Sequence, residues 1–337
     1  MPIVTTEHFK NGNLPQSKNG IPQVSDDDYY RLRGYKLEKD DIVFSRVGSI
    51  DINAHVEQSQ QGWLFSGRVL RVRPIKSVNS LCLHYILSTE SVKRSIRNRA
   101  VGQTMPSINT PILSNTKINI PQSVVEQKKI ANLLALLDKR IAIQSKVIDK
   151  LQSLIKGISS KIFASIQGIE YRMGDIASIT NGNSNVQDAV AEPNDGLYPF
   201  FDRSEDIKYL STFLFDKEAI IYPGEGAEFI PRYFKGKFAL HQRCYAIFDF
   251  NEIINAQYLY FYLKTQNSYF VRNAVGSTVP SLRLDTFQKL KVVVPPKEIQ
   301  YSVSLCLSLM EQKFKFENEI LQNLLKQKQY LLRQMFI

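Results

Sequence analysis

A seven-residue motif that occurs twice constrains the fold of this chain more than any other feature. The sequence Gly-Gln-Thr-Met-Pro-Ser-Ile at 102–108 returns as Gly-Ser-Thr-Val-Pro-Ser-Leu at 276–282, which is 174 residues further along. Each copy leads into a short apolar run ending in proline, at 118–121 and 292–295, and we predict a strand for both. A long helical pattern follows each run. The sequence therefore predicts two copies of one unit.

Both helical patterns have the heptad spacing of a coiled coil, because their apolar residues step alternately by four and three. Matching polar interruptions stand at Gln144 and Glu317, and each either fixes the register or lies near solvent. Lys328 takes the place of Ile155, so we expect a looser end to the second seam. The predicted seams are Ile130, Leu134, Leu137, Ile141, Ile148 and Leu151 in the first helix, and Val303, Leu307, Met310, Phe314, Leu321 and Leu324 in the second.

Composition excludes several classes of protein. Of the 337 residues, 43% are hydrophobic, which is enough for two to four domains with real cores. No apolar run reaches the ~18 residues that span a membrane, and the N-terminus lacks the layout of a signal peptide. The three cysteines, Cys82, Cys244 and Cys306, are odd in number and widely spaced. We therefore expect a cytoplasmic protein without a disulfide framework or membrane contact.

The net charge of +11 is concentrated in the first half of the chain. Residues 1–166 carry 24 Lys and Arg against 13 Asp and Glu, whereas residues 167–337 carry 19 of each. The first half therefore has the charge of a polyanion binder. A generally basic cytosolic protein is the alternative explanation.

No catalytic or metal-binding motif is present. The sequence has no phosphate-binding loop, no Gly-x-Gly-x-x-Gly, no Gly-x-Ser-x-Gly and no Asn-Pro-Pro-aromatic tetrad. Its histidines, His8, His55, His84 and His241, have no partner at ligand spacing, so we expect no metal site. We predict no catalytic residues and no cofactor bound by this chain.

The fold class that follows is α+β, with four segments. Two similar mixed α/β domains occupy 1–121 and 168–296, and long helices occupy 122–167 and 297–337. Strands are predicted at 41–44 and 68–73 and a helix from 81 to about 98, with matching pieces at 219–222, 244–248 and 256–264. The second domain opens with 171–179, for which we find no counterpart before Pro2, so the first domain's opening element is expected to be missing. Two helices packed antiparallel through matching seams would relate the domains by a pseudo-twofold axis.

Basic residues near predicted strands and turns are the candidates for binding DNA, because arginine and glutamine make bidentate contacts to base edges and phosphates. Ordinary surface charge is the alternative for each of them. For the aromatic residues between the second-domain candidates, Tyr233, Phe234 and Phe238, a place in the core is the alternative to stacking on bases. The first-domain candidates are Arg46, Arg68, Arg71, Arg73, Arg94, Arg97 and Arg99; the second-domain candidates are Arg232, Lys235, Lys237, His241, Gln242 and Arg243.

The layout of domain, helix, domain, helix resembles the specificity (S) subunit of type I restriction-modification systems. The resemblance rests on the two Gly-x-Thr-x-Pro motifs, on the proline-ended runs, and on Glu126-Gln127 at the start of the first helix. The opening at 171–179 and the strand and turn at 41–48 also resemble that family. The second helix departs from the pattern, with Glu298-Ile299-Gln300 at its start. The resemblance covers nearly the whole chain.

The resemblance implies a subunit without catalysis of its own. It would recognise a bipartite site on double-stranded DNA, with one half bound by each target-recognition domain. It would dock two methyltransferase (M) subunits, which use S-adenosylmethionine, and restriction (R) subunits, which use ATP and Mg. The recognised bases, the gap length and the stoichiometry do not follow from it, and neither does whether the short first domain is functional or an active R subunit is present. A coiled-coil scaffold bridging protein partners without DNA recognition is the alternative, and the neutral second half favours it.

Overall fold

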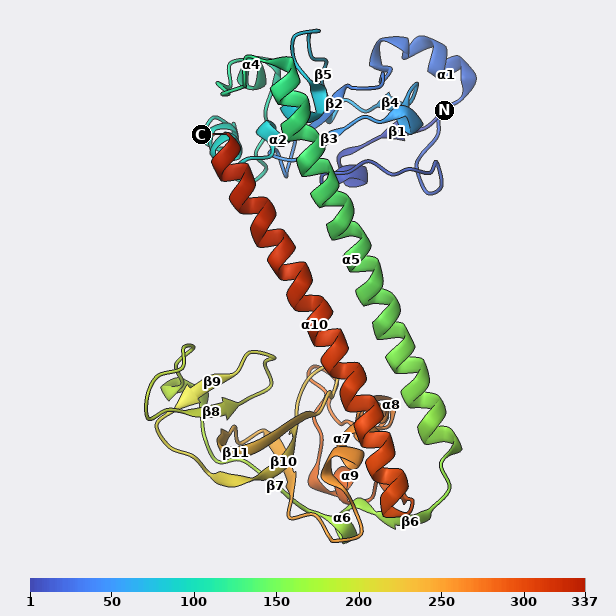
Figure 1. Cartoon of the computed structure of the whole chain (residues 1–337), viewed down its shortest axis with the longest axis vertical. Coiled ribbons are helices and arrows are strands. Elements are labelled where there is room, and N and C mark those ends of the chain that lie inside the picture. The colour runs from blue at the N-terminus through green and yellow to red at the C-terminus, as the bar shows by residue number, and fades with distance from the viewer. Residues whose placement is uncertain (337) are drawn as a thin grey trace. The chain divides into compact units, whose positions relative to one another are not determined.

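The computed structural model describes residues 1–336, and the chain divides into two compact units. The first unit comprises Met1–Ser145 with Glu319–Ile337, and the second comprises Lys146–Asn318. Two long helices, α5 (Val124–Ser165) and α10 (Lys297–Met335), each contribute to both units (Figure 1). The expected α+β class, with two similar domains and two long helices, is confirmed.

The first unit is built on small sheets. Strand β2 is the centre of a three-stranded antiparallel sheet of order β3-β2-β5, and β1 pairs in parallel with β4. The Ile-Val-Phe run of β2 is fully buried, because one core packs on each face of the sheet. The elements of this unit are β1 (Ile3–Val4), β2 (Ile42–Ser45), β3 (Asn53–His55), β4 (Leu64–Phe65), β5 (Val69–Val72), α1 (Asp26–Arg31), α2 (Ser80–Leu87), α3 (Glu90–Arg97) and α4 (Thr110–Ser114), with 3-10 helices at Thr6–Phe9, Arg33–Tyr35 and Gln58–Gln60.

The second unit contains a larger sheet of six strands in the order β7-β12-β10-β11-β8-β9. Helices α7 and α9 lie between this sheet and the first part of α10 (Figure 1), and together with α8 they contribute to a core that includes Tyr222, Tyr258, Phe270 and Phe287. The elements are β6 (Ile169–Arg172), β7 (Ser178–Asn181), β8 (Tyr198–Phe201), β9 (Lys208–Leu210), β10 (Phe215–Pro223), β11 (Arg232–Leu240), β12 (Cys244–Phe248), β13 (Lys291–Val294), α6 (Met173–Ile176), α7 (Ala256–Lys264), α8 (Asn267–Asn273) and α9 (Leu284–Gln288), with a 3-10 helix at Val186–Asp188.

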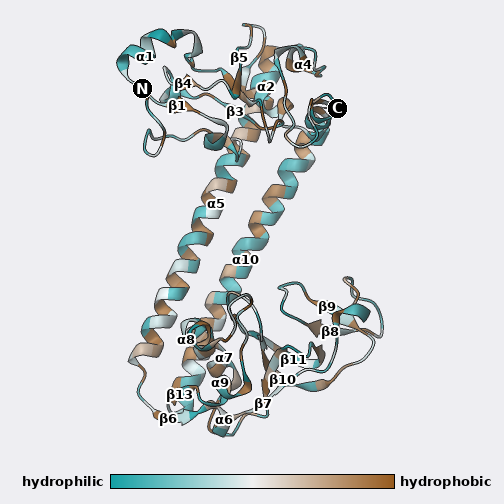
Figure 2. Ribbon diagram, turned by 180° about the vertical axis from the view of Figure 1, so that it is seen from behind, coloured by the Kyte–Doolittle hydropathy of each residue, from teal (hydrophilic) through white to brown (hydrophobic). Residues whose placement is uncertain are grey.

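The long helices run antiparallel within each unit. In the first unit Asp138 of α5 pairs with Lys328 of α10. Phe336, which follows α10, packs on a cluster that includes Ala131 near the start of α5. In the second unit the end of α5 and the start of α10 pack on one cluster through Phe163 and Val303. Apolar residues recur along both helices (Figure 2), and every predicted seam residue is buried or half-buried.

The polar seam positions differ from their apolar neighbours in what they contact. Glu317 is buried and pairs with Lys313 one turn away, while Gln144 is half-buried. Lys328 is half-buried, with Nζ 2.5 Å from Oδ1 of Asp138. The end of the second seam therefore carries an ion pair where the first has an isoleucine.

The same glutamine joins each long helix to a short one. Gln127 accepts a hydrogen bond from the backbone N–H of Asn79, which caps α2, and donates to carbonyls of Ser77 and Pro121. Gln300 repeats this arrangement with Asn255, Ile253 and Pro295 at the start of α7. The start of the second helix, which departs from the family pattern in sequence, therefore keeps the glutamine in its structural place.

Two predicted elements are wrong. The helix expected from 81 to about 98 is two helices, α2 and α3, because Ser88 and Thr89 bond the carbonyls of His84 and Ile86 and end the first. The run at 118–120 belongs to no strand. Its counterpart β13 makes its ladder with β6, the strand that opens the second domain, and the described residues contain no such opening in the first domain.

Among residues 1–336, no helix is both long enough and apolar enough to cross a lipid bilayer. Cys82, Cys244 and Cys306 are all free thiols.

Candidate functional site

Three turns meet at one point of the first domain, and we name them the junction. Residues 46–48 follow β2, residues 66–68 precede β5, and residues 102–107 form the motif loop. Backbone N–H groups tie them together: Arg46 donates to Arg68 (3.0 Å), Ile108 to Arg46 (2.9 Å), and Gly48 to Pro106 (2.9 Å).

The second domain contains the same junction, made by residues 224–226, 241–243 and 276–281. Gly224 donates to the carbonyl of Arg243 (2.9 Å), Leu282 to that of Gly224 (2.8 Å), and Gly226 to that of Pro280 (3.0 Å). The strand registers agree, since Ser45 pairs with Val69 as Pro223 pairs with Cys244. Arg68 and Arg243 therefore occupy the same position in the two domains.

The motif loop needs its glycine for a steric reason. Gly102 and Gly276 have φ of +96° and +106°, a region that favours glycine. A Cβ would come within 2.9 Å of the Met105 carbonyl oxygen and 2.8 Å of the Val279 carbonyl oxygen. Each loop closes with a pair of backbone hydrogen bonds, Val101 with Ser107 and Val275 with Ser281, and exposes its Gly-x-Thr-x tip.

Five of the predicted DNA-binding residues lie in these junctions: Arg46, Arg68, His241, Gln242 and Arg243. In the first domain Arg46 and Arg68 are exposed, and Nη1 of Arg46 donates to the carbonyl of Gly67. In the second, Gln242 and Arg243 are exposed and line a hollow of about 310 Å³ with the half-buried His241, together with Asp202, Arg203 and Glu225. Arg243 donates to both carboxylate oxygens of Glu225, at 2.8 and 3.0 Å.

Other predicted residues are engaged inside the first domain. Arg71 lies in β5, and Arg73 follows the end of that strand. Arg73 makes two bonds to the buried carboxylate of Asp41 and one to Glu38, which raises the pKa of its guanidinium. Arg71 donates to the carbonyl of Lys36 (2.7 Å) and lies over the Phe65 ring.

The arginines of α3 and the segment after it also differ in their contacts. Arg97 forms ion pairs with Asp51 and Glu90, and Arg99 donates to the carbonyl of Asn115. Arg94 is exposed, and within residues 1–336 its guanidinium makes no ion pair.

The basic residues of β11 also differ in their contacts, and two of them lie over aromatic rings. Arg232 is half-buried over the Phe201 ring and donates to the carbonyl of Ser204, and burial lowers the pKa of its guanidinium. Lys237 lies over the Phe213 ring, 4.8 Å from its centroid, and Lys235 is exposed. Phe238, which follows Lys237 in β11, belongs to the core.

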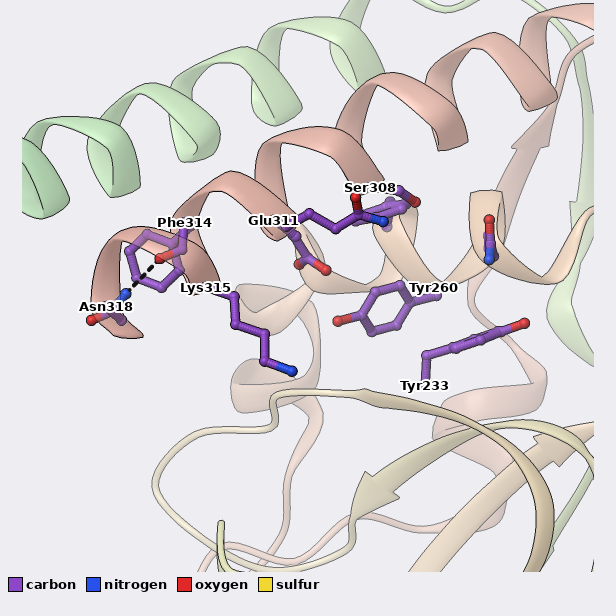
Figure 3. A pocket seen from close by; sticks show the side chains of 10 residues that line it. Tyr233, Tyr260, Ser308, Glu311, Phe314, Lys315 and Asn318 are labelled. Carbon is purple, nitrogen blue, oxygen red and sulfur yellow. Dashed lines mark hydrogen bonds between the residues drawn. The ribbon is translucent and has the colours of Figure 1, made fainter. Parts of the chain in front are cut away.

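A second repeated feature lies where each domain meets a long helix. In the second unit an open hollow of about 640 Å³ lies between β11, α7 and α10 (Figure 3). Tyr233 and Tyr260 face each other with ring centroids 5.8 Å apart, and Tyr233 donates to Glu218. Glu311 of α10 forms an ion pair with Lys264 at the side of this hollow.

Histidines take the place of the tyrosines in the first unit. The ring centroids of His55 and His84 are 6.5 Å apart. Nε2 of His55 lies 3.4 Å from Oδ1 of Asp40, which corresponds to the contact of Tyr233 with Glu218 in the second unit. Nδ1 of His84 donates to Oδ1 of Asn53 (2.6 Å). His84 lines a hollow of about 330 Å³ with Tyr85, whose hydroxyl donates to Asp138 of α5.

Burial controls the protonation of these histidines. It lowers the pKa of His84 to about 3, with repulsion from His55, Lys328 and Lys93 adding to the effect. Burial also lowers the pKa of His55, although Asp40 and Glu57 act in the opposite direction. Both rings are therefore neutral near pH 7.

Sequence reasoning missed the ring pairs. The first-domain histidines were scattered in the sequence, and their second-domain counterparts are tyrosines. The offset between equivalent residues also changes, from 178 for His55 and Tyr233 to 176 for His84 and Tyr260, because the loops differ in length. The signal that could have found them is an alignment of the two halves anchored separately on each strand and helix.

Comparisons with known proteins agree with this repeat. The family model for the type I restriction modification DNA specificity domain matches residues 1–153 and again 169–326. The chain belongs to that family. The S subunit of a type I restriction-modification system from M. genitalium has the same fold, with a TM-score of 0.67 and 18% identity over 90% of this chain and 84% of that one.

Curated specificity subunits match over shorter stretches. The Escherichia coli EcoDI specificity subunit is 32% identical over 127 residues, which is 38% of this chain and 28% of that protein. The Methanocaldococcus jannaschii MjaVIII specificity subunit is 31% identical over 83 residues, which is 25% of this chain and 19% of that protein. The aligned parts thus span less than a third of these relatives.

Proposed function

We propose that this chain is the DNA sequence-specificity subunit of a type I restriction-modification complex and that each domain recognises one half of a bipartite site on double-stranded DNA. The observation that carries the proposal is the repeated junction, set in two domains whose surroundings differ. The second domain adds β8 and β9, and its strands β10 and β11 are nine residues long each, while the strands of the first domain are short. Domains with one framework and different surfaces suit two half-sites of different sequence.

The charge distribution supports contact with a polyanion. Residues 1–166 carry the whole excess of positive charge, 24 basic against 13 acidic residues. Exposed Arg46, Arg68 and Arg94 in this part can bind phosphate, whereas Arg73 and Arg97 are held by carboxylates.

The partners follow from the family and from the exposed faces of the long helices. Leu136, Ile143 and Leu154 on α5, and Leu305, Leu309 and Phe316 on α10, are more than half exposed. Such apolar residues on a helix face fit a protein partner. We infer that these faces dock two methyltransferase subunits and that restriction subunits join the complex.

The chemistry would reside in those partners, in the cytoplasm. S-adenosylmethionine, ATP and Mg would be bound there, and this chain would hold no cofactor and catalyse no reaction. The exposed helix faces also fit the second candidate, a scaffold that bridges proteins without DNA recognition, so the test must separate the two.

The proposal is tested by mapping the methylated adenines of a genome. The chain is co-expressed with its cognate methyltransferase subunit, and N6-methyladenine is mapped by single-molecule sequencing. We expect a split motif with a fixed gap that disappears when the chain is omitted. The matched control is the methyltransferase subunit alone at the same expression level.

Two results would contradict the proposal in different ways. No new methylation from a complex that copurifies would favour the scaffold. A motif with one defined half, or a symmetric motif, would show that only one of the two domains recognises DNA.

A further inference from the structure

The two junctions are alike in the groups that they expose. In both, an arginine ends the turn before the β5 or β12 strand, and the backbone carbonyl of that arginine is held by the neighbouring turn. In both, the tip of the motif loop is exposed, the Pro-Ser step is half-buried and the last apolar residue is buried. This similarity persists although the surrounding loops differ in length and sequence.

Groups that are the same in both domains cannot distinguish two different half-sites. The one feature that every half-site shares is its sugar-phosphate backbone. A repeated cationic position therefore suits the phosphate, and the parts that differ are left to recognise bases. This step rests on the proposed function.

We propose that Arg68 and Arg243 are equivalent phosphate anchors, one in each domain, and that the junction binds the DNA backbone without selecting sequence. Each anchor lies beside a second guanidinium group. Arg46 bonds to the turn that carries Arg68, and Arg203 lines the same hollow as Arg243. Two guanidinium groups on adjoining segments can each donate to oxygens of one phosphate.

The two anchors differ in how they are held. Nη1 of Arg243 is held by Glu225, which leaves its Nη2 and Nε donors for a ligand. The guanidinium of Arg68 has no such carboxylate among residues 1–336, because Val47 occupies the place of Glu225. The second anchor is therefore oriented before binding, and the first is oriented by the ligand.

The test uses the complex of the full chain with its methyltransferase subunit. Arg68→Gln and Arg243→Gln keep most of the side-chain length and remove the charge. Each is expected to weaken binding of the target duplex and of an unrelated duplex by a similar factor of about ten. The slope of log affinity against log salt should become shallower by about one for each variant. The methylated motif should stay unchanged.

Arg31→Gln and Lys217→Gln are matched controls, because each removes one exposed charge that is paired with a carboxylate, in α1 and near the end of β10 opposite the junction. They are expected to leave the salt slope as it is. A wild-type slope in Arg68→Gln and Arg243→Gln would overturn the inference. So would an altered methylation motif, which would assign these arginines to base recognition. The wild-type complex tests the proposed function separately: if it bound no DNA, the proposed function would be wrong, whatever the variants do.

Discussion

Gly276 and Gly102 hold the motif loop in a conformation that other residues adopt only with strain. A Cβ at either position would meet a backbone carbonyl oxygen, which cannot move aside as a flexible side chain can. The motif is therefore required by the geometry of the turn, whatever the loop contacts.

Gly276→Ala is expected to lower the free energy of unfolding by about 1–3 kcal/mol, because it combines positive φ with a clash. Gly157→Ala is the matched control, since a Cβ there meets nothing within 4 Å on α5. That change should raise stability by about 0.5–1 kcal/mol. Chemical denaturation measures both, and equal midpoints for the two variants would contradict the argument.

His84 makes the first unit sensitive to acid. Its pKa is about 3 in the folded protein and near the ordinary 6.5 in the unfolded chain, so only the unfolded chain takes up this proton between those pH values. The contribution of neutral His84 to the free energy of unfolding is fully present above pH 6.5. It decreases as the pH drops below this value, by up to about 1.4 kcal/mol per pH unit for one proton. His84→Gln keeps a donor for Asn53 and should give a shallower fall. His8→Gln is the control, and superimposable slopes for wild type and His84→Gln would contradict the assignment.

At the scale of elements, one buried glutamine fixes each long helix to its domain. Gln300 is completely buried and satisfies three backbone groups, which belong to the start of α7, the loop before it and the end of β13. The matching bonds of Gln127 show that this attachment belongs to the repeated framework.

Gln300→Met keeps the volume but leaves those three groups without partners, and a loss of about 3 kcal/mol or more is expected. Gln322→Met, at an exposed position of α10, should change stability by less than about 0.5 kcal/mol. Thermal unfolding followed by circular dichroism compares them. A small effect of Gln300→Met would mean that water or neighbouring side chains replace its amide.

At the scale of the whole molecule, each long helix has two apolar sides. One is the seam, which is buried or half-buried, and the other is exposed at Leu136 on α5 and Leu309 on α10. These two leucines are 173 residues apart, the offset that relates the two seams. The exposed side is thus repeated as well, which suits two copies of one partner.

Leu136→Glu and Leu309→Glu should each weaken binding of the methyltransferase subunit by about tenfold or more, since both residues would enter the core of an interface. The melting temperature should stay within a few degrees of wild type because both side chains are exposed. Gln152→Glu and Gln329→Glu add the same charge at exposed polar positions. Calorimetric titration measures affinity, and equal affinities for leucine and glutamine variants would place the docking surface elsewhere.

The sequence alone determined the repeat, the fold class and the long helices, because the repeat is a direct match between two parts of the sequence and the helices depend on periodicity within one segment. The expected helices at 122–167 and 297–337 correspond to α5 and α10 within a few residues. The tertiary structure decided which arginines are available: Arg73 and Arg97 meet carboxylates 32 and 46 residues away, while Arg68 and Arg94 meet none within residues 1–336. It also brought together the junction turns and the ring pairs, whose members are separated by loops of unequal length. Contacts of that kind depend on how strands and helices pack in space, which no spacing along the chain records.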